Sequence, residues 1–288
     1  MEQAGLLSGK GVRLSSANSI NVGRLAPQVV YYFKAYADLV KRGRIEVGDP
    51  VDFAVPTGNF GDILAGYFAR ELGLPVGKLI CASNANNILT DFLTTGVYDR
   101  NRPFFKTVSP SMDILVSSNL ERLLFLLSRD AKLVAGLMAS LSETGAYTVP
   151  ASLKAQLDEL FFAGWCGDAG TKATIGRVWR EYGYLMDTHT AVACDVARQY
   201  KAACPDHAPV VILSTASPFK FPAAVLEALG EDPGADEFGA MARVEEITGM
   251  PMPKNLKGLR DRPVRHRDVI GPEQMLPYVL NKAEQEKW

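Results

Sequence analysis

The chain has 288 residues, of which 47% are hydrophobic and 22% are charged. This composition is typical of a soluble globular protein and excludes a largely disordered chain. Its 31 Lys and Arg against 32 Asp and Glu give a formal net charge of -1, which provides no basic field for nucleic acid or an anionic membrane.

The N-terminal sequence lacks the charged start and long apolar stretch of a signal peptide, and no apolar run approaches the length of a membrane span. We therefore expect a cytoplasmic protein. Its cysteines and histidines are too widely spaced for a disulfide framework or a metal site, which predicts reduced thiols and no bound metal. They are Cys81, Cys166, Cys194 and Cys204, and His189, His207 and His266.

The first third of the chain predicts a β-α-β unit. An amphipathic helical pattern over residues 25–43 is followed by a short apolar strand at 51–56, a helix at 62–72 and a second strand at 77–83. The connection between the two strands is long enough for them to run parallel.

The rest of the chain continues with helices and one strong strand. A capping-box pattern at Ser118 and Glu121 precedes a helical stretch, and Pro222 and Gly230 bound a short helix. The predicted helices are 123–141, 151–165, 174–200 and 222–229, and the strand is 208–216.

This order of elements predicts an α/β fold with an open, mainly parallel sheet and helices on both faces. We expect one large domain over residues 1–230. Residues 231–288 are polar and proline-bearing before a last short helix, and we expect them to form a peripheral C-terminal extension packed on that domain.

One stretch of the β-α-β unit, "VPTGNFGDILAGYFAREL", passes through Gly58 and Gly61 between the strand and the helix. A helix that begins after such a turn leaves backbone N–H groups without partners at the positive end of its dipole, which suits a phosphate. The two glycines equally fit a tight turn without a ligand. The sequence matches neither the nucleotide P-loop, because no Lys follows Gly61, nor the dinucleotide fingerprint, because the glycine intervals differ.

Several segments in the same order resemble threonine synthase, a pyridoxal-phosphate (PLP) enzyme of fold type II. The resemblance runs from about Asn18 to Phe221. It is carried by "SANSINVGRLAPQVVYYF", "PTGNFGDILAGYFARELGLPVGKLICASNANNIL", "VSPSMDILVSSNLERLLF" and "DTHTAVA".

The resemblance implies a PLP site in the loop at residues 57–62. It assigns the coenzyme phosphate to the five loop residues Gly58, Asn59, Phe60, Gly61 and Asp62. Asp62, an anion beside a dianionic phosphate, equally fits a helix cap or an N-terminal helix charge.

Further roles follow from the same resemblance. It assigns Thr215 to the pyridine nitrogen, and a buried strand end is the alternative for this hydroxyl. Ser19 or Asn21 would approach substrate or cofactor, unless these side chains serve as helix caps.

Three other positions are ambiguous. The family usually carries His where this chain has Ser217, so any contact made by that imidazole is in doubt. Lys220 matches the family but equally fits a surface charge. His189 is more typical of a structural histidine than of a catalytic one.

In this family PLP is bound as a Schiff base to a lysine in an N-terminal segment that resembles Thr-Leu-Ala-Phe-Lys-Asp, and this chain has no such segment. Lys10, Lys78 and Lys106 lie in other contexts. We therefore expect that the N-terminal small domain is absent and that this polypeptide alone is inactive. We also expect a homodimer, or association with a lysine-bearing N-terminal segment.

The family converts O-phospho-L-homoserine and water to L-threonine and phosphate. Two alternatives remain for this chain. One is a catalytically incompetent homologue that binds PLP or a phosphorylated metabolite, and the other is a related phospho-lyase that stops after elimination.

Overall fold

The computed structural model describes residues 15–285, which divide into two compact units. The larger unit runs from Ser19 to Pro253, and the smaller unit holds the residues from Lys254 onward together with those before Ser19. The predicted extension over residues 231–288 therefore includes residues of both units, and its packing on the domain stays a prediction.

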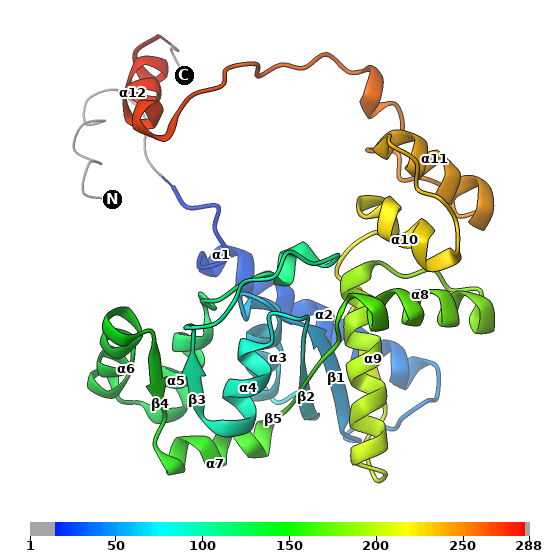
Figure 1. The fold of residues 1–288 in the computed structure, drawn as a ribbon. Helices are drawn as coiled ribbons and strands as arrows, with labels where there is room; N and C mark the ends of the chain where they lie inside the picture. Colours follow the sequence, from blue (N-terminus) through cyan, green and yellow to red (C-terminus); the bar gives the residue numbers. More distant parts are fainter. Residues whose placement is uncertain (1–14, 286–288) are drawn as a thin grey trace. The chain divides into compact units, whose positions relative to one another are not determined.

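A four-stranded parallel sheet in the order β5-β2-β1-β6 organises the larger unit (Figure 1). A separate two-stranded antiparallel sheet pairs β3 with β4. The strands are β1 (Val51–Pro56), β2 (Val76–Ser83), β3 (Val97–Asp99), β4 (Ala146–Thr148), β5 (Phe161–Trp165) and β6 (Val210–Ile212). The α/β class and the mainly parallel sheet are thus confirmed.

Helices connect and flank these strands. Those before β4 are α1 (Val22–Leu25), α2 (Val29–Lys41), α3 (Gly61–Glu71), α4 (Ile88–Thr95), α5 (Leu120–Ser128) and α6 (Ala131–Thr144). Those after it are α7 (Ala151–Leu160), α8 (Asp168–Tyr182), α9 (Thr188–Ala203), α10 (Pro222–Leu229), α11 (Glu237–Thr248) and α12 (Met275–Gln285).

The central strands are buried on both faces because successive side chains point to opposite sides. Phe53 and Val55 of β1 belong to a core shared with α2 and α3, whereas Ala54 between them belongs to a second core shared with α9. Helices therefore cover both faces of the sheet, as the sequence predicts.

The β-α-β unit β1-α3-β2 agrees with its predicted ranges to within one residue at each end of β1 and α3. Phe53 lies opposite Leu79 in the parallel register. Gly66 allows α3 to approach its neighbours closely, because an added Cβ there would lie 2.7 Å from the Tyr32 ring and 2.8 Å from a Leu79 methyl group.

A buried carboxylate links β1 to its neighbours. Asp52 is 2% exposed, and its Oδ1 accepts a hydrogen bond from the Lys78 amide at 2.6 Å. Its Oδ2 accepts from the Tyr200 hydroxyl at 2.9 Å. Since both oxygens have donors, the cost of burying this group is largely offset.

The single helix predicted over residues 123–141 is wrong, because it is two helices. Arg129 adopts the left-handed conformation with φ 54° and ends α5, and Asp130 then caps α6 by accepting from the amides of Lys132 and Leu133. The predicted capping box also fails, because no side chain caps the start of α5.

Two further helix predictions are wrong in part, one at its end and one in its middle. Residues 161–165, predicted as the end of a helix, form strand β5, which enters the sheet directly after α7. The helix predicted over residues 174–200 is interrupted at Gly183, where φ is 64°, and a new helix begins after the cap residue Asp187. Helix α11 and the β3-β4 pair were not predicted.

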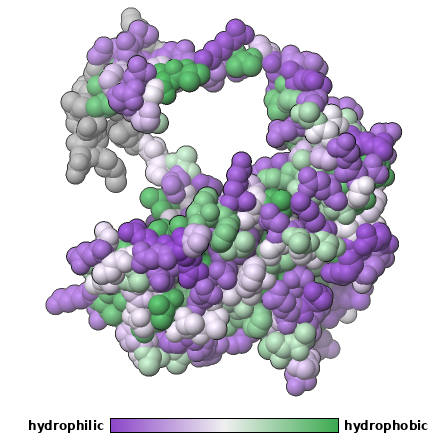
Figure 2. All heavy atoms as spheres, viewed as in Figure 1, coloured by the Kyte–Doolittle hydropathy of each residue, from purple (hydrophilic) through white to green (hydrophobic). Residues whose placement is uncertain are grey.

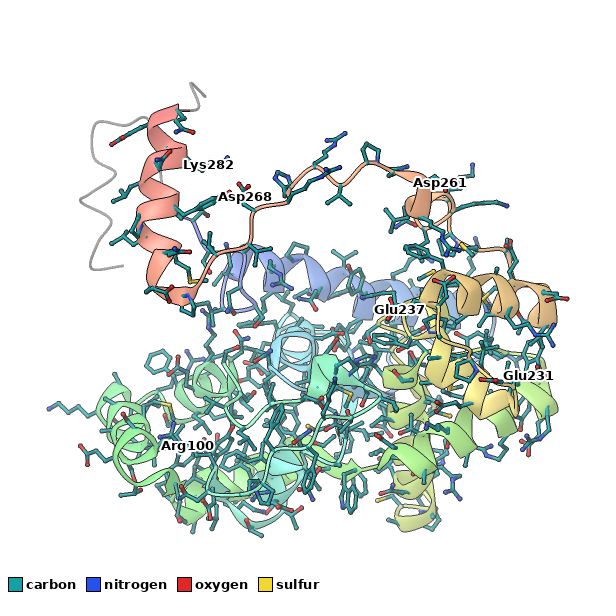
Figure 3. All side chains as sticks on the ribbon, turned by 45° about the horizontal axis from the view of Figure 1, so that its top comes forward. Arg100, Glu231, Glu237, Asp261, Asp268 and Lys282 are labelled. Atoms are coloured by element: carbon teal, nitrogen blue, oxygen red, sulfur yellow. The ribbon has the colours of Figure 1, made fainter. Side chains whose placement is uncertain are left out.

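The smaller unit contains α12. The Tyr278 hydroxyl of this helix donates to Asp268 Oδ2 at 2.6 Å. Lys282 Nζ lies 3.6 Å from the same oxygen, and Figure 3 labels Asp268 and Lys282. On the face of the molecule in Figure 2, hydrophobic residues are scattered among hydrophilic ones across the larger unit.

Candidate functional site

The candidate site begins in the turn between β1 and α3. Phe60, the residue before α3, has a left-handed backbone (φ 62°, ψ 9°), which is rare for a residue other than glycine. Burial holds it there, since the Phe60 side chain is 1% exposed and its ring lies 5.8 Å from that of Phe161 in β5. A left-handed residue followed by helix turns successive amides toward one concave surface, a geometry that binds anions.

The amides of this turn lack protein acceptors. Thr57 N donates to Ala82 O at 2.8 Å, and the first helical hydrogen bond runs from Leu64 N to Phe60 O. Within residues 15–285, none of the amide N–H groups of residues 58–63 donates a hydrogen bond to a protein oxygen. They stand at the positive end of the α3 dipole, where an anion is stabilised.

The carbonyl side of the same turn is fixed by the segment just before α5. Ser117 Oγ donates to Gly58 O at 2.9 Å, and Asn119 Nδ2 donates to Asn59 O at 2.8 Å. Ser118 Oγ donates to Asn59 Oδ1 at 3.2 Å instead of capping α5. Sequence reasoning missed the roles of these three residues, because their partners lie about 60 positions away in the chain.

Gly58 and Gly61 differ in the space that the structure leaves for a side chain. A Cβ on Gly58 would lie 2.9 Å from the carbonyl oxygen of Ser111 and 3.1 Å from Met112 Cα, so the backbones approach too closely for a side chain. A Cβ on Gly61 would meet its nearest neighbour, Asn119 Nδ2, at 3.8 Å, which is ordinary contact. Close packing therefore requires a glycine at 58 and does not require one at 61.

The turn forms one wall of a cavity of about 280 Å³. The structure brings together there all five predicted phosphate-loop residues, Thr215 and Ser19. Asn21 instead caps α1, where its Oδ1 accepts from Gly23 N at 2.8 Å. The other lining residues are Arg24, Gln28, Pro56, Thr57, Ile63, Ser111, Met112, His189, Ala216 and Lys220.

Asp62, in the first turn of α3, shares this cavity. The Tyr32 hydroxyl donates to the Asp62 carbonyl oxygen at 2.7 Å and lies 3.2 Å from its Oδ1. Burial raises the pKa of the Asp62 carboxyl to about 6, and the hydrogen bond from Tyr32 offsets part of this rise. Asp62 makes no side-chain hydrogen bond to a backbone amide within the described residues, so it does not cap the helix.

His189 also lines the cavity and is engaged at both ring nitrogens. Its Nε2 accepts from the Ser111 amide at 3.1 Å, which requires a lone pair there, so the proton resides on Nδ1, 3.1 Å from Asp187 Oδ1. Burial alone would raise the pKa of Asp187, but hydrogen bonds from His189 and Thr190 outweigh it and lower the pKa. This arrangement holds the 3₁₀ turn Pro110–Met112 against the loop at residues 57–62.

Thr215 and Lys220 come from the segment after β6. Both are exposed, and both line the cavity. Lys220 Nζ lies 5.7 Å from the centre of the Phe221 ring. Ser217, at the position that departs from the family, accepts from the Phe219 amide at 3.4 Å and caps the 3₁₀ turn Pro218–Lys220.

Other site types have little support in the part of the chain that the structure describes. None of the helices among residues 15–285 combines the length and apolar character needed to cross a bilayer. The described residues contain no group of three or more His, Cys, Asp or Glu side chains arranged to hold a metal ion. The four cysteines are free thiols.

Comparison with protein families and known sequences gives consistent results. The family described as "Threonine synthase, C-terminal" matches residues 190–275. Human threonine synthase-like 1 is 48% identical over 222 residues, which are 76% of this chain and 29% of that protein. Threonine synthase of Pseudomonas aeruginosa is 44% identical over 252 residues, which are 84% of this chain and 51% of that protein. The chain thus spans about half or less of the length of these relatives.

Solved structures show the same relationship. A PLP-bound threonine synthase from Brucella melitensis superposes with a TM-score of 0.81 at 38% identity, covering 99% of this chain and 55% of that chain. Threonine synthase from yeast superposes with a TM-score of 0.81 at 30% identity, covering 95% of this chain and 54% of that chain.

Proposed function

We propose, because this chain belongs to the threonine synthase family, that it forms the phosphate-anchoring part of a PLP enzyme. The proposed reaction converts O-phospho-L-homoserine and water to L-threonine and phosphate, in the cytoplasm. One observation carries the proposal. The amides of residues 58–63 line a cavity at the start of α3 and have no acceptor among the described protein atoms.

The residues around the cavity fit PLP. The coenzyme phosphate matches the unpaired amides. Gly58 supports this loop shape, because the backbone of the loop packs closely against Ser111, where a Cβ would collide. The Thr215 hydroxyl suits the pyridine nitrogen, because it can hold that nitrogen without forcing a proton onto it. When bound, PLP supplies the electron sink for the carbanions formed as protons leave the substrate.

We further propose that the 288-residue chain does not complete the reaction by itself. None of its lysines stands in the sequence context in which the family carries the lysine that binds PLP. Lys220 does line the cavity, but its exposed side chain suits a rim cation that attracts phosphate groups. The missing amine would come from a lysine-bearing N-terminal segment, and a homodimer is the alternative assembly.

Titration of the purified chain with PLP, followed by absorbance, tests the proposal. We expect saturable binding, and borohydride should leave no coenzyme attached to any lysine. Absence of saturable binding contradicts the proposed site. Coenzyme fixed on Lys220, and lost in Lys220→Ala, contradicts the expected inactivity.

A matched pair of glycine variants locates the binding. Gly58→Ala should weaken PLP binding at least about tenfold, because its Cβ would displace the loop from Ser111. Gly136→Ala in α6 should bind normally, since nothing lies within 4 Å of the added Cβ. Equal binding by both variants would show that PLP lodges elsewhere.

The alternative function is ligand binding in the same cavity without catalysis. The human relative that is 48% identical is named threonine synthase-like 1 rather than threonine synthase, which favours keeping a binding-only homologue as the alternative. A related phospho-lyase is the third case. With a lysine-bearing partner added, L-threonine supports the synthase, a keto acid with phosphate supports the lyase, and retained binding without product supports the binding protein.

A further inference from the structure

The carboxyl of Asp62 stands in the cavity that we propose for the phosphate, beside the amides at the start of α3. Its Oδ1 faces the Tyr32 hydroxyl at 3.2 Å. Its Oδ2 receives no hydrogen bond from the described protein atoms, so this oxygen is open to a ligand. A negatively charged group at this place would oppose the anion that the amides attract.

The surroundings do not neutralise this carboxylate. Tyr32 on α2 contacts this carboxylate. The other titratable or charged groups that line the same cavity are Arg24 on α1, Lys220 after β6 and His189 on α9. No Lys or Arg among the described residues forms an ion pair with Asp62. Both ring nitrogens of His189 are engaged, by Ser111 and Asp187. Tyr32 is buried, which raises the pKa of its hydroxyl well above the usual value.

The Asp62 carboxyl can adjust its charge near neutral pH. Burial already raises the pKa of the carboxyl to about 6. A phosphate monoester is a dianion above its second pKa of about 6, and such a neighbour further favours the protonated carboxyl.

We propose that Asp62 takes up one proton from solvent when a phosphate ester enters the cavity. The proton forms an O–H bond at Oδ2, and the neutral carboxyl then donates a hydrogen bond to an ester oxygen in place of repelling it. This inference rests on the proposed function, because it requires the phosphate to bind beside the amides of residues 58–63.

Proton uptake makes the affinity depend on pH. At pH 8 the free carboxyl is charged, so binding includes the cost of protonating it. The affinity for a phosphate ester should therefore fall about tenfold for each pH unit above 6, until the bound complex itself loses the proton.

Calorimetry with methyl phosphate tests this inference, because the ligand has no group that titrates near pH 8. Titration at pH 8 in two buffers of different ionisation enthalpy counts the protons taken up on binding. We expect about one proton for the wild type and about none for Asp62→Asn, with at least about tenfold tighter binding by the variant. Glu71→Gln, at the other end of α3, removes the same charge and should behave as the wild type.

The outcomes separate this inference from the function on which it rests. If methyl phosphate binds and is displaced by PLP, but no proton is taken up, the role of Asp62 is overturned and the proposed site is not. Uptake of one proton by Asp62→Asn also overturns it, since the proton then goes to another group. Failure of both proteins to bind methyl phosphate and PLP overturns both proposals. The proton count of the wild type decides the question even if the variant does not fold.

Discussion

The Ser117 hydroxyl donates to the carbonyl oxygen of Gly58 at 2.9 Å across 59 positions of sequence. This bond turns the carbonyl side of the loop at residues 57–62 toward the start of α5, so that the amide side is left facing the cavity. The conformation of the loop thus depends on Ser117, although this residue does not itself line the cavity.

Replacing Ser117 with Ala should weaken PLP binding about three- to tenfold. The variant leaves the Gly58 carbonyl without its buried donor, at a cost of about 1–2 kcal/mol in the free energy of unfolding. Absorbance titration measures the first effect and urea denaturation the second. Ser142→Ala, on an exposed position of α6, is the control, and equal affinities of the two variants would refute the supporting role.

Asp62→Asn should stabilise the protein at neutral pH. The pKa of this carboxyl rises from 3.8 to about 6 on folding, so the folded state binds the proton more tightly than the unfolded state. Above pH 6 the carboxyl is ionised in both states, so the folded state bears the full cost of burying its charge. At about 1.4 kcal/mol per pKa unit, this cost is at most about 3 kcal/mol. Below pH 4 both states are protonated and the cost vanishes.

Urea denaturation of this variant and the wild type at pH 4 and pH 8 measures that difference. The gain in the free energy of unfolding should be present at pH 8 and lost at pH 4. A gain of the same size at both pH values would mean that the carboxyl charge is not its cause.

Tyr200→Phe should destabilise the larger unit by about 2 kcal/mol. The change removes the hydroxyl that donates to Asp52 Oδ2 and leaves that buried carboxylate oxygen without a donor. Chemical denaturation measures the loss. Tyr184→Phe, at a position that is 50% exposed, should have an effect close to zero, and a similar loss in both variants would argue against the buried bond.

Two glycines within helices should respond to alanine with opposite signs. Gly66→Ala in α3 should destabilise by about 1–3 kcal/mol, because its Cβ would overlap the Tyr32 ring and Leu79. Gly136→Ala in α6 has open space and should stabilise by about 0.5–1 kcal/mol through helix propensity. Thermal denaturation of the pair measures both, and stabilisation of both variants would disprove the tight packing at Gly66.

The sequence carries enough local signal to predict the β1-α3-β2 unit. Its strands are mainly apolar, although β1 contains Asp52 and β2 contains Lys78, and the glycines of its turn mark the start of α3. The same signals are missing where the predictions failed. Leu160 ends α7 and Phe161 begins β5 with no turn residue between them, so the apolar run reads as one helix. Arg129 ends α5 in a left-handed conformation without the usual glycine.

Some parts of the candidate site could likewise be predicted from the sequence, and others could not. The loop residues 58–62 can be recognised from a contiguous motif, and Thr215 only from its resemblance to the family. Asn119 and the pairing of Tyr32 with Asp62 depend on contacts between distant segments, which local patterns do not encode. The sequence favours a structural role for His189, but its contact with Ser111 could not be predicted from local patterns.

The packing of Phe60 against Phe161 ties the loop at residues 57–62 to a strand of the central sheet. The concave set of amides is therefore preorganised by folding, and a ligand need not order a mobile loop in order to bind there. Since binding then favours the native state as a whole, the thermal midpoint of unfolding should rise with ligand concentration and report how fully the cavity is occupied.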